Sequence, residues 1–272
     1  MIQYPYCKIN LGLSIIAKRA DSYHELETVF YPIALKDILE IIPTRNQELT
    51  HFSHSGISIP GDSKNNLCLK AYQLLKNDFP TLPEIQMHLH KVIPMGAGLG
   101  GGSSDGTTAL IILNDLFQLN LSHDQLMAYA ETLGSDCPFF LFNRTCHASG
   151  KGEILSPIHI DLSNYQIVLL HPGIHIATQW AFQQINPCKK ERSIKDIIQE
   201  PIQHWKHTLV NDFEAPVIQS HPIIGALKND MYQQGAVYAS MSGSGSSLFG
   251  IFEKDKKYQP SNLTSNMRID IV

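Results

Sequence analysis

The stretch that decides the fold is Pro94–Leu110, which reads PMGAGLGGGSSDGTTAL and carries six glycines in the eleven positions 96–106. Each such glycine loses conformational entropy on folding and packs no side chain. A strand-like pattern, EIQMHLHKVIP, leads into this stretch, and an apolar helix-like run leaves it. A flexible linker would be flanked by polar residues. The pattern therefore predicts a functional loop, in which the backbone itself is exposed to a ligand.

The glycine-rich loop is predicted to bind phosphate groups. Glycines let backbone N–H groups approach phosphate oxygens closely, and the N-terminus of the following helix adds unpaired donors and a positive dipole end. Ser103 and Ser104 add hydroxyl donors at the rim. A P-loop is excluded because no lysine follows the glycines. A Rossmann pattern fits Gly96, Gly98 and Gly101, but it lies far from the N-terminus and no acidic residue closes a strand ~20 residues later. The sequence indicates a third kind of phosphate loop.

The bulk composition excludes several classes of partner and compartment. The chain has 272 residues, 43% of them hydrophobic, and a net charge of −4. No basic field favours nucleic acid or an anionic membrane. The N-terminus lacks a cationic segment and a cleavage site, and no apolar run approaches the ~20 residues that span a bilayer. The five cysteines are scattered without a C-x-x-C pair, so neither a disulfide framework nor a zinc site is predicted. We expect a cytoplasmic protein.

Hydrophobic periodicity gives the order of the elements. Alternation over residues 9–15 predicts a strand, which places Lys8 and Asn10 on the face opposite its apolar row. Other elements are predicted as strands within 26–35, 37–42, 84–94 and 165–173, and as two strands within 236–252. A helix capped by Asn65 or Asn66, helices over 104–119 and 122–134, and helices from Thr178 onward are also predicted, with loop and strand material over 135–155. Ser122 and Gln125 form a capping-box pattern. This irregular mixture predicts an α+β fold, with one domain over 1–156 and a second over 157–272.

At the loop the sequence resembles the GHMP kinases (galactokinase, homoserine kinase, mevalonate kinase and phosphomevalonate kinase), whose ATP loop reads P-x-x-x-G-L-G-[SG]-S-S. The blocks KINLGLSIIAKRADSYHELETVF, LGSDCPFFL, NDFEAPV and MSGSGSSLFGIF resemble the 4-diphosphocytidyl-2-C-methyl-D-erythritol kinases of the non-mevalonate isoprenoid pathway. They run in order over nearly the whole chain. The resemblance implies an N-terminal ribosomal-S5-domain-2-like domain and a C-terminal ferredoxin-like domain. It also implies transfer of the ATP γ-phosphate to the C2 hydroxyl of a diphosphocytidyl-methylerythritol.

The resemblance assigns the catalytic residues. Asp136, in GSDCP, matches the proposed general base; its spacing alone would suggest a turn residue after a helix-ending glycine. Lys8 matches a lysine that keeps that carboxylate ionised, because an opposite charge nearby favours the charged form. Asn10, two residues along the same strand face, would hold a substrate hydroxyl.

The resemblance also assigns the two binding sites. Tyr23 and Phe182 would sandwich the cytosine, His24 would read its polar edge, and Thr178 would join them; from periodicity alone, Phe182 is a core residue. The expected ATP-binding residues are Pro94, Met95, Gly96, Ala97, Gly98, Leu99, Gly100, Gly101, Gly102, Ser103, Ser104, Asn66, Leu67, Lys91, Gly243 and Ser244. The small residues 242–245 would let a turn approach the phosphate loop closely.

Two positions depart from the usual pattern of the family. Ser22 stands where the family usually has glycine, which costs about 1 kcal/mol if φ is positive there. Gly106 replaces a commoner alanine in the helix, at a cost of up to ~1 kcal/mol.

The remaining expectations concern metals, assembly and rival functions. The histidine pairs 88/90 and 204/207 lack a third ligand, so no protein-bound metal is expected beyond Mg²⁺ arriving with ATP. We expect a monomer or a weak homodimer. The nearest alternative function is that of a homoserine or mevalonate kinase. The presence of Tyr23, His24 and Phe182 argues against this alternative.

A second alternative is a catalytically inactive nucleotide sensor. The presence of Lys8 and Asp136 argues against it.

Overall fold

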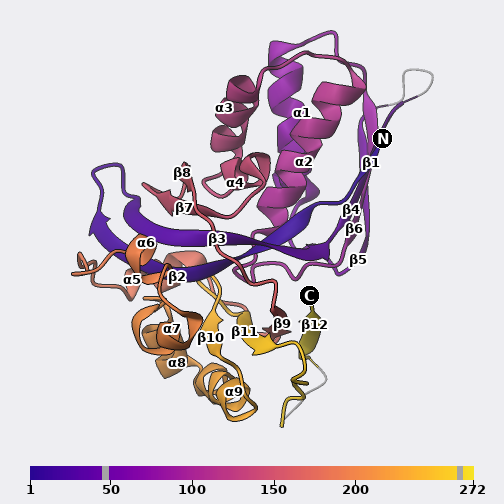
Figure 1. Ribbon diagram of the computed structural model, residues 1–272. Coiled ribbons are helices and arrows are strands. Elements are labelled where there is room, and N and C mark those ends of the chain that lie inside the picture. The colour runs from indigo at the N-terminus through magenta and orange to yellow at the C-terminus, as the bar shows by residue number, and fades with distance from the viewer. Residues whose placement is uncertain (45–48, 262–265) are drawn as a thin grey trace. The chain divides into compact units, whose positions relative to one another are not determined.

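The computed structural model describes residues 1–44, 49–261 and 266–272, and it divides into two compact units (Figure 1). Unit 1 comprises Met1–Cys7, Ala34–Met95 and Gly100–Asn143. Unit 2 comprises Lys8–Ile33, Gly96–Leu99 and Arg144–Val272. The glycine-rich loop therefore contributes to both units. The domain boundary at residue 156 stays a prediction, since the two units are not consecutive stretches of chain.

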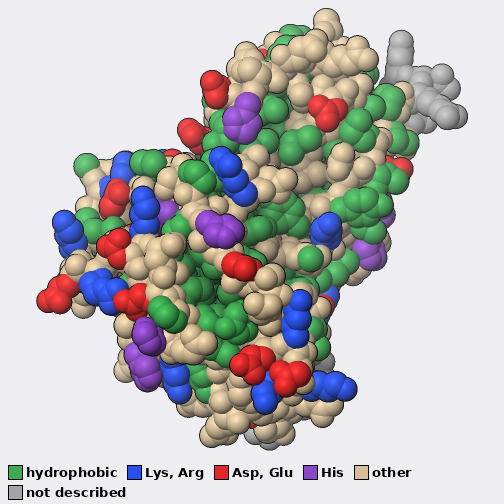
Figure 2. All heavy atoms as spheres, in the orientation of Figure 1, with side chains coloured by type: hydrophobic (Ala, Val, Ile, Leu, Met, Phe, Trp, Pro, Cys, Tyr) green, Lys and Arg blue, Asp and Glu red, His purple; other side chains and the backbone are tan. Residues whose placement is uncertain are grey.

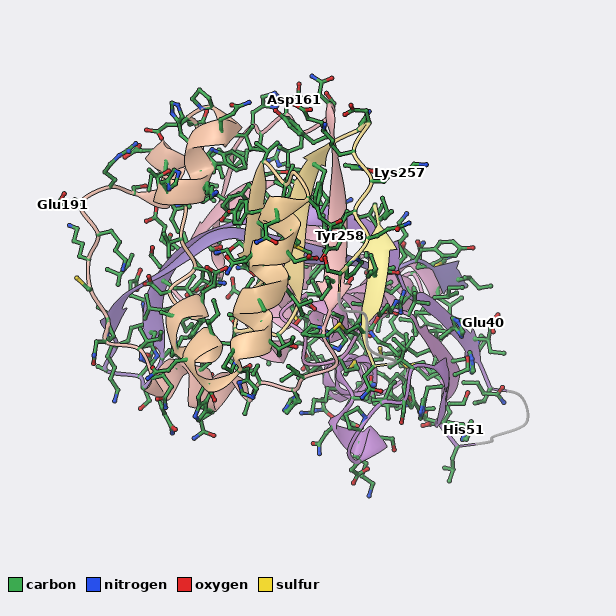
Figure 3. The ribbon with its side chains drawn as sticks, turned by 90° about the horizontal axis from the view of Figure 1, so that it is seen from below. Glu40, His51, Asp161, Glu191, Lys257 and Tyr258 are labelled. Carbon is green, nitrogen blue, oxygen red and sulfur yellow. The ribbon has the colours of Figure 1, made fainter. Side chains whose placement is uncertain are left out.

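Unit 1 contains a four-stranded sheet with the order β1 (Ile2–Gln3), β4 (Ile38–Pro43), β6 (Ile85–Lys91) and β5 (His51–Gly56). Strand β6 runs antiparallel to β4 and parallel to β5. Its alternate residues Ile85, Met87 and Leu89 are buried, as the period-2 pattern predicts. Glu40 on β4 and His51 at the start of β5 are exposed (Figure 3). Strand β5 was not predicted, because its six residues, HFSHSG, hold one large apolar side chain and are ordered by pairing with β6.

In the part of unit 1 that the structure describes, the helices are a short 3₁₀ helix, η1 (Ser63–Asn65), and the α-helices α1 (Leu67–Asp78), α2 (Gly101–Leu116), α3 (His123–Leu133) and α4 (Cys137–Phe142). Of the two expected caps, Asn66 is the one that caps α1, accepting a hydrogen bond from the Cys68 N–H at 2.9 Å. The capping box of α3 is confirmed in full. Helix α2 begins three residues earlier than predicted. The expectation of loop and strand material was wrong for 137–142, where Pro138 occupies the first turn of a helix and suits that position.

Unit 2 contains two sheets. One has the order β2 (Tyr6–Lys18), β3 (His24–Lys36), β7 (Cys146–Ser149) and β8 (Ile154–Pro157). The start of β2, up to Cys7, and the end of β3, from Ala34, belong to unit 1. The other is antiparallel, with the order β10 (Tyr238–Met241), β11 (Leu248–Glu253), β9 (Tyr165–His171) and β12 (Arg268–Ile271). The strand expected within 165–173 and the two expected within 236–252 are confirmed. They place the turn of residues 242–247 between β10 and β11.

The helices of unit 2 are α5 (Thr178–Gln183), α6 (Ile194–Ile197), α7 (Ile202–Thr208), α8 (Glu214–Ser220) and α9 (Pro222–Gln233). Apolar residues of α5, α8 and α9 join Leu13, Ile15 and the buried face of β9 in one core. Tyr258 belongs to this core, with its ring centroid 5.5 Å from that of Phe252 (Figure 3). Its hydroxyl donates to Asp230 Oδ2 at 3.0 Å. The predicted α+β class is confirmed.

Acidic and basic side chains are interspersed on the face drawn in Figure 2, in keeping with the small net charge. Within residues 1–44, 49–261 and 266–272, no helix has the length and apolarity needed to cross a membrane.

Candidate active site

The glycine-rich loop turns by alternating left-handed residues. Gly96, Gly98 and Gly100 have φ of +59°, +77° and +69°, a region that favours glycine. The residues between them are anchored, since the Ala97 and Leu99 side chains are each only 2% exposed. A Cβ on Gly98 would lie 1.9 Å from the carbonyl oxygen of Ser242, so no other residue fits there without moving the backbone. The loop is thus a fixed structure.

In unit 2 this loop is bonded to the first and third sequence motifs. The Gly98 carbonyl accepts hydrogen bonds from the Ser242 hydroxyl at 2.8 Å and from Lys8 Nζ at 3.4 Å. The Lys8 N–H donates to the Leu99 carbonyl at 3.0 Å. Gly243, with φ of +55°, stacks its backbone on that of Gly98. The close approach expected of the third motif is therefore present.

Lys8 and Asn10 form a buried polar pair on β2. Their residues are 3% and 1% exposed, and Lys8 Nζ donates to Asn10 Oδ1 at 2.7 Å. Asn10 Nδ2 donates to Thr28 Oγ1 at 3.0 Å, which fixes the orientation of the amide. The ammonium also lies 4.9 Å from the centre of the Phe30 ring, a cation–π distance. Lys8 is thus held in place rather than solvated at the edge of a strand.

The residues expected at the cytosine lie at the start of β3 and in α5. The His24 ring stacks on Phe182, with centroids 4.8 Å apart and an interplanar angle of 22°. Phe182 also meets Phe213 edge-on at 4.9 Å and packs on the core of unit 2, as its periodicity predicts. Tyr23 is 56% exposed, with Lys151 Nζ 4.8 Å from its ring centre. Burial, aided by the charge of Lys18, lowers the pKa of His24 and favours a neutral imidazole.

Two further observations concern this region of unit 2. The Thr178 and Ser244 hydroxyls lie 3.1 Å apart and link α5 to the third motif. Ser22 has a φ of +68°, the conformation in which a serine is strained. Its turn is held by the Arg19 N–H, which donates to the Tyr23 carbonyl at 2.9 Å, and by the Tyr23 N–H, which donates to Asp21 Oδ1 at 3.1 Å. Tyr23 therefore keeps a defined backbone position.

In unit 1 the first turn of α2 has a closed side and an open side. A Cβ on Gly101 would meet Ile93 Cγ2 at 2.8 Å, whereas a Cβ on Gly102 would meet nothing within 4 Å. Ser103 is half-buried, but Ser104 is fully buried, and its hydroxyl has no hydrogen-bond partner in the part of the chain that the structure describes. Gly102 and Ser103 thus face outward, while Ser104 does not lie at the rim.

The residues expected near adenine lie on α1 and β6. The Asn66 side chain is engaged in capping α1. A Cβ on Gly106 would lie 2.7 Å from the Leu67 Cβ, so this glycine lets α2 pack closely on α1. That close packing explains why alanine is absent at position 106. The Lys91 side chain is fully buried, and its ammonium binds the carboxylates of Asp37 at 2.5 Å and Asp105 at 2.8 Å.

Asp136 occupies the N-cap position of α4, where it is half-buried and does not cap the helix with its side chain. The backbone around it is fixed on both sides. The Cys137 N–H donates to the Gly134 carbonyl at 3.1 Å, and the Thr107 hydroxyl of α2 donates to the Cys137 carbonyl at 3.0 Å. The helix that follows the phosphate loop thereby positions the backbone beside Asp136.

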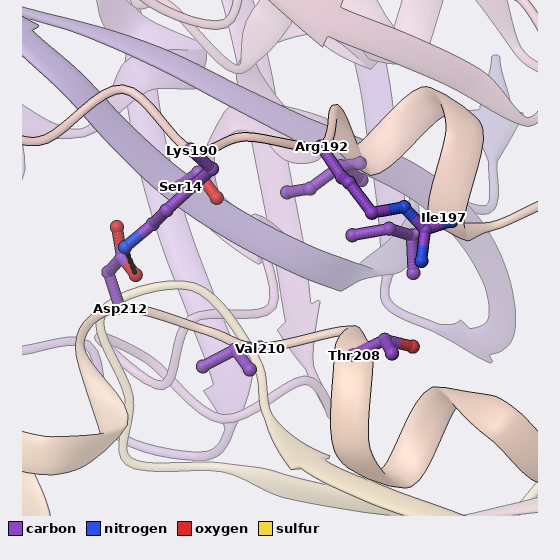
Figure 4. Close-up of a pocket in the computed structure, with 8 residues that line it drawn as sticks. Ser14, Lys190, Arg192, Ile197, Thr208, Val210 and Asp212 are labelled. Atoms are coloured by element: carbon purple, nitrogen blue, oxygen red, sulfur yellow. Dashed lines mark ion pairs between the residues drawn. The ribbon is translucent and has the colours of Figure 1, made fainter.

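A pocket of about 320 Å³ lies elsewhere in unit 2, between β2 and the segments that carry α6 and α7 (Figure 4). Lys190 and Asp212 form an ion pair of 3.0 Å across it. Leu209, which lies between the lining residues Thr208 and Val210 in the chain, packs over Gly12 of β2. No motif in the sequence pointed to this pocket, because its lining is assembled from residues distant in the chain: Ser14, Lys190, Arg192, Ile194, Ile197, Thr208, Val210 and Asp212.

The histidines of β6 bond to a neighbouring strand. His88 and His90 lie at 2.9 Å from the hydroxyls of Ser53 and Ser55 on β5. Among the residues that the structure describes, no three or more His, Cys, Asp or Glu side chains gather as a metal site.

Comparison with known proteins places this geometry in a family. The model of the GHMP kinase N-terminal domain matches residues 66–144, and that of the C-terminal domain matches 194–262. The 4-diphosphocytidyl-2-C-methyl-D-erythritol kinase of Bacteroides thetaiotaomicron is 52% identical over 94% of this chain and 93% of its own. The enzyme of that name from Cytophaga hutchinsonii is 49% identical over 98% of both chains.

Solved structures agree with this placement. A crystal structure of 4-(cytidine 5'-diphospho)-2C-methyl-D-erythritol kinase superposes with a TM-score of 0.78 and 31% identity, over 92% of this chain and 90% of that one. The Methanococcus jannaschii mevalonate kinase, 13% identical with a TM-score of 0.73 over 100% of this chain and 97% of its own, shares the fold. The two-domain GHMP kinase fold predicted from the motifs is confirmed, as is the dependence on ATP that defines these kinases. The chain belongs to the GHMP kinase family, within its group of 4-diphosphocytidyl-2-C-methyl-D-erythritol kinases.

Proposed function

We propose that this protein transfers the γ-phosphoryl group of ATP to the C2 hydroxyl of 4-diphosphocytidyl-2-C-methyl-D-erythritol. The observation that carries the proposal is the network of Lys8, Asn10, Gly98 and Ser242, which joins the phosphate loop to the residues assigned to the acceptor. The names and high identity of the relatives support the same substrate.

The nucleotide end of the site is made of backbone. Gly98 and Gly243 pack without side chains, and Gly102 leaves the first turn of α2 open, which suits close approach by a polyphosphate. We assign residues 94–104 with Gly243 and Ser244 to the phosphates, and the neighbourhood of Asn66, Leu67 and Lys91 to adenine. Mg²⁺ bound with ATP would neutralise charge on the phosphate oxygens.

At the acceptor end, the C2 oxygen attacks the γ-phosphorus as the bond from that phosphorus to the β,γ-bridging oxygen breaks, and ADP leaves. The hydroxyl proton passes to the Asp136 carboxylate. Lys8 lies in a buried setting where Asn10 and Phe30 orient its ammonium group. We assign to it the stabilisation of negative charge during the transfer, and to Asn10 the holding of the acceptor.

The cytidine end uses aromatic rings. We assign Tyr23 and Phe182 to the two faces of the base and His24 to its polar edge, with Thr178 beside them. The stacking of His24 on Phe182 holds the imidazole next to the aromatic platform. A mevalonate or homoserine substrate would gain nothing from this set, because neither has a ring to stack.

We also propose that the enzyme acts in the cytoplasm as a monomer or weak homodimer. Its cysteines are free thiols, four of them buried, which fits a reducing compartment.

One assay tests the substrate. Purified protein with Mg-ATP is offered the cytidyl substrate, mevalonate and homoserine in turn, and both ADP and the phosphorylated product are quantified. We expect turnover of the cytidyl substrate alone. Turnover of mevalonate without the cytidyl substrate would overturn the proposal, and ATP binding without any turnover would favour the nucleotide sensor.

A further inference from the structure

Three charged side chains of unit 1 form a buried cluster, and their charged groups have no role in the reaction just described. Lys91 Nζ contacts Asp37 Oδ2 at 2.5 Å and Asp105 Oδ2 at 2.8 Å. The Lys91 and Asp37 side chains are 0% exposed, and that of Asp105 is 4% exposed. We call Asp37, Lys91 and Asp105 the charged triad.

The charged triad connects the two ends of the glycine-rich loop. Lys91 is the last residue of β6, and Asp37 Oδ1 accepts hydrogen bonds from the next two backbone N–H groups, those of Val92 at 2.5 Å and Ile93 at 2.9 Å. Asp105 lies in the N-terminal part of α2, immediately after the loop. The strand that enters the loop and the helix that leaves it are therefore bonded through one ammonium group.

The start of α2 rests on the same support. A Cβ on Gly101 would lie 2.8 Å from Ile93 Cγ2 and 3.3 Å from Lys91 Nζ. The helix thus begins directly against the strand exit that Asp37 holds. A shift of Lys91 or Ile93 would be transmitted to the first turn of α2.

Burying the three charged groups of the triad costs more free energy than burying apolar side chains in the same place would. Two carboxylates face one ammonium, and Asp105 Oδ1 has no hydrogen-bond partner among the described residues. Burial, opposed by Lys91 and reinforced by Asp37, raises the pKa of Asp105 to about 7. Buried ion pairs are often replaced by apolar residues without loss of stability. A third buried charge at this place is therefore better explained by a task than by stability.

We propose that the charged triad is a positioning device that fixes the distance between β6 and α2, so that the intervening glycines present their backbone to the phosphates of ATP. The inference rests on the proposed function, because it concerns the nucleotide site of that kinase. It makes Asp37, Lys91 and Asp105 positioning residues, whose buried charged groups act on ATP through the loop.

The test compares two changes at one position. Asp105→Leu removes the bond between α2 and Lys91, and we expect the KM for ATP to rise at least tenfold, while the KM for the cytidyl substrate changes less than threefold. Asp105→Asn keeps an acceptor for Lys91, and we expect it to restore the KM for ATP to within threefold of the original. Ile112→Val, a buried change in the same helix, is the matched control. It should lower the unfolding midpoint and leave both KM values unchanged.

The outcomes separate the inference from the function on which it rests. If the unaltered protein phosphorylates the cytidyl substrate and Asp105→Leu keeps its KM for ATP within twofold, the positioning role is wrong and the function stands. If the unaltered protein transfers no phosphate, the proposed function fails. Should Asp105→Leu not fold, Lys91→Met/Asp105→Leu removes the ion pair as a whole and leaves Asp37 on its two backbone N–H groups. An unchanged KM for ATP in that variant would equally overturn the inference.

Discussion

Gly98 and Ser242, 144 residues apart in the chain, meet backbone to backbone. The Ser242 hydroxyl donates to the Gly98 carbonyl at 2.8 Å, and a Cβ on Gly98 would fall 1.9 Å from the Ser242 carbonyl oxygen. The loop assigned to ATP is therefore shaped by a turn near the other end of the sequence.

Gly98→Ala should damage this arrangement. The new methyl group meets backbone, and φ of +77° is unfavourable for alanine, so we expect a loss of about 1–3 kcal/mol in the free energy of unfolding and at least a tenfold rise in the KM for ATP. Urea denaturation and steady-state kinetics measure the two effects. For stability the matched control is Gly102→Ala, which has open space and should gain up to ~1 kcal/mol as a helical residue. Equal stabilities for the two variants would contradict the close contact.

Asp136→Asn tests the proton acceptor. The amide is nearly the same size but cannot take the hydroxyl proton, so we expect turnover to fall at least ~100-fold with ATP binding retained. Rapid-quench product formation and equilibrium ATP binding measure these separately. Asp124→Asn, an exposed change on α3, serves as control and should keep full activity. Near-normal turnover of Asp136→Asn would remove Asp136 from the catalytic residues.

Phe182→Ala tests the aromatic platform. Loss of the ring leaves His24 without its stacking partner, so we expect weaker binding of the cytidyl substrate, by about 1–3 kcal/mol, and an unchanged KM for ATP. Phe182→Tyr keeps the ring and should retain most of the affinity. A variant that lost stability with no change in either KM would assign Phe182 to the core of unit 2 alone.

Glu27 should give the folded state a pH dependence. Although burial opposes it, hydrogen bonds from His147 and Ser193 and from the Lys195 N–H lower the pKa of Glu27 to about 2. A depressed pKa stabilises the fold above the ordinary value of 4.5, and this contribution is lost as the pH falls from there towards 2. At pH 7 we expect Glu27→Gln to cost about 1.5–3 kcal/mol in the free energy of unfolding.

The difference between Glu27→Gln and the unaltered protein should shrink steadily as denaturation is repeated from pH 5 down to pH 2.5. Glu131→Gln, exposed on α3, should show no such pH-dependent gap. A constant gap across the range would mean that Glu27 is not held as a buried carboxylate.

Ser22→Gly should stabilise the protein. Serine is unfavourable at φ of +68°, and glycine removes that penalty while adding some entropy to the unfolded chain, for a net gain of about 0.5–1 kcal/mol. Ser22→Ala keeps the strain and should give no gain. Thermal denaturation of both variants decides whether the turn is strained.

Local patterns predicted much of the fold. The strands β2 and β6, the Asn66 cap and the capping box of α3 have short-range signals, and all are confirmed. The alternation in β2 indicated one buried face, whereas the structure buries both faces over Cys7–Ile15. Strand β5 and helix α4 were not predicted. Strand β5 is ordered by its pairing with β6, and the short apolar sequence of α4 fits either a strand or a helix.

The residues of the candidate site could be predicted where they lie in sequence motifs, but not where their position depends on packing. The motifs brought together Lys8, Asn10 and the glycine loop, which the structure joins in unit 2. Nothing in the spacing revealed that Lys91 and Ser104 are buried, since burial depends on what the rest of the chain lays over them. Asp37 and Asp105 were overlooked because single charges near the ends of apolar segments usually face water.

The winding of the chain through the two units bears on how such an enzyme can evolve. Residues 8–33 supply Leu13 and Ile15 to a core that is otherwise built from the second half of the sequence. Each unit is assembled from three separate stretches of the chain, so a single crossover between genes cannot exchange one whole unit for that of a distant relative.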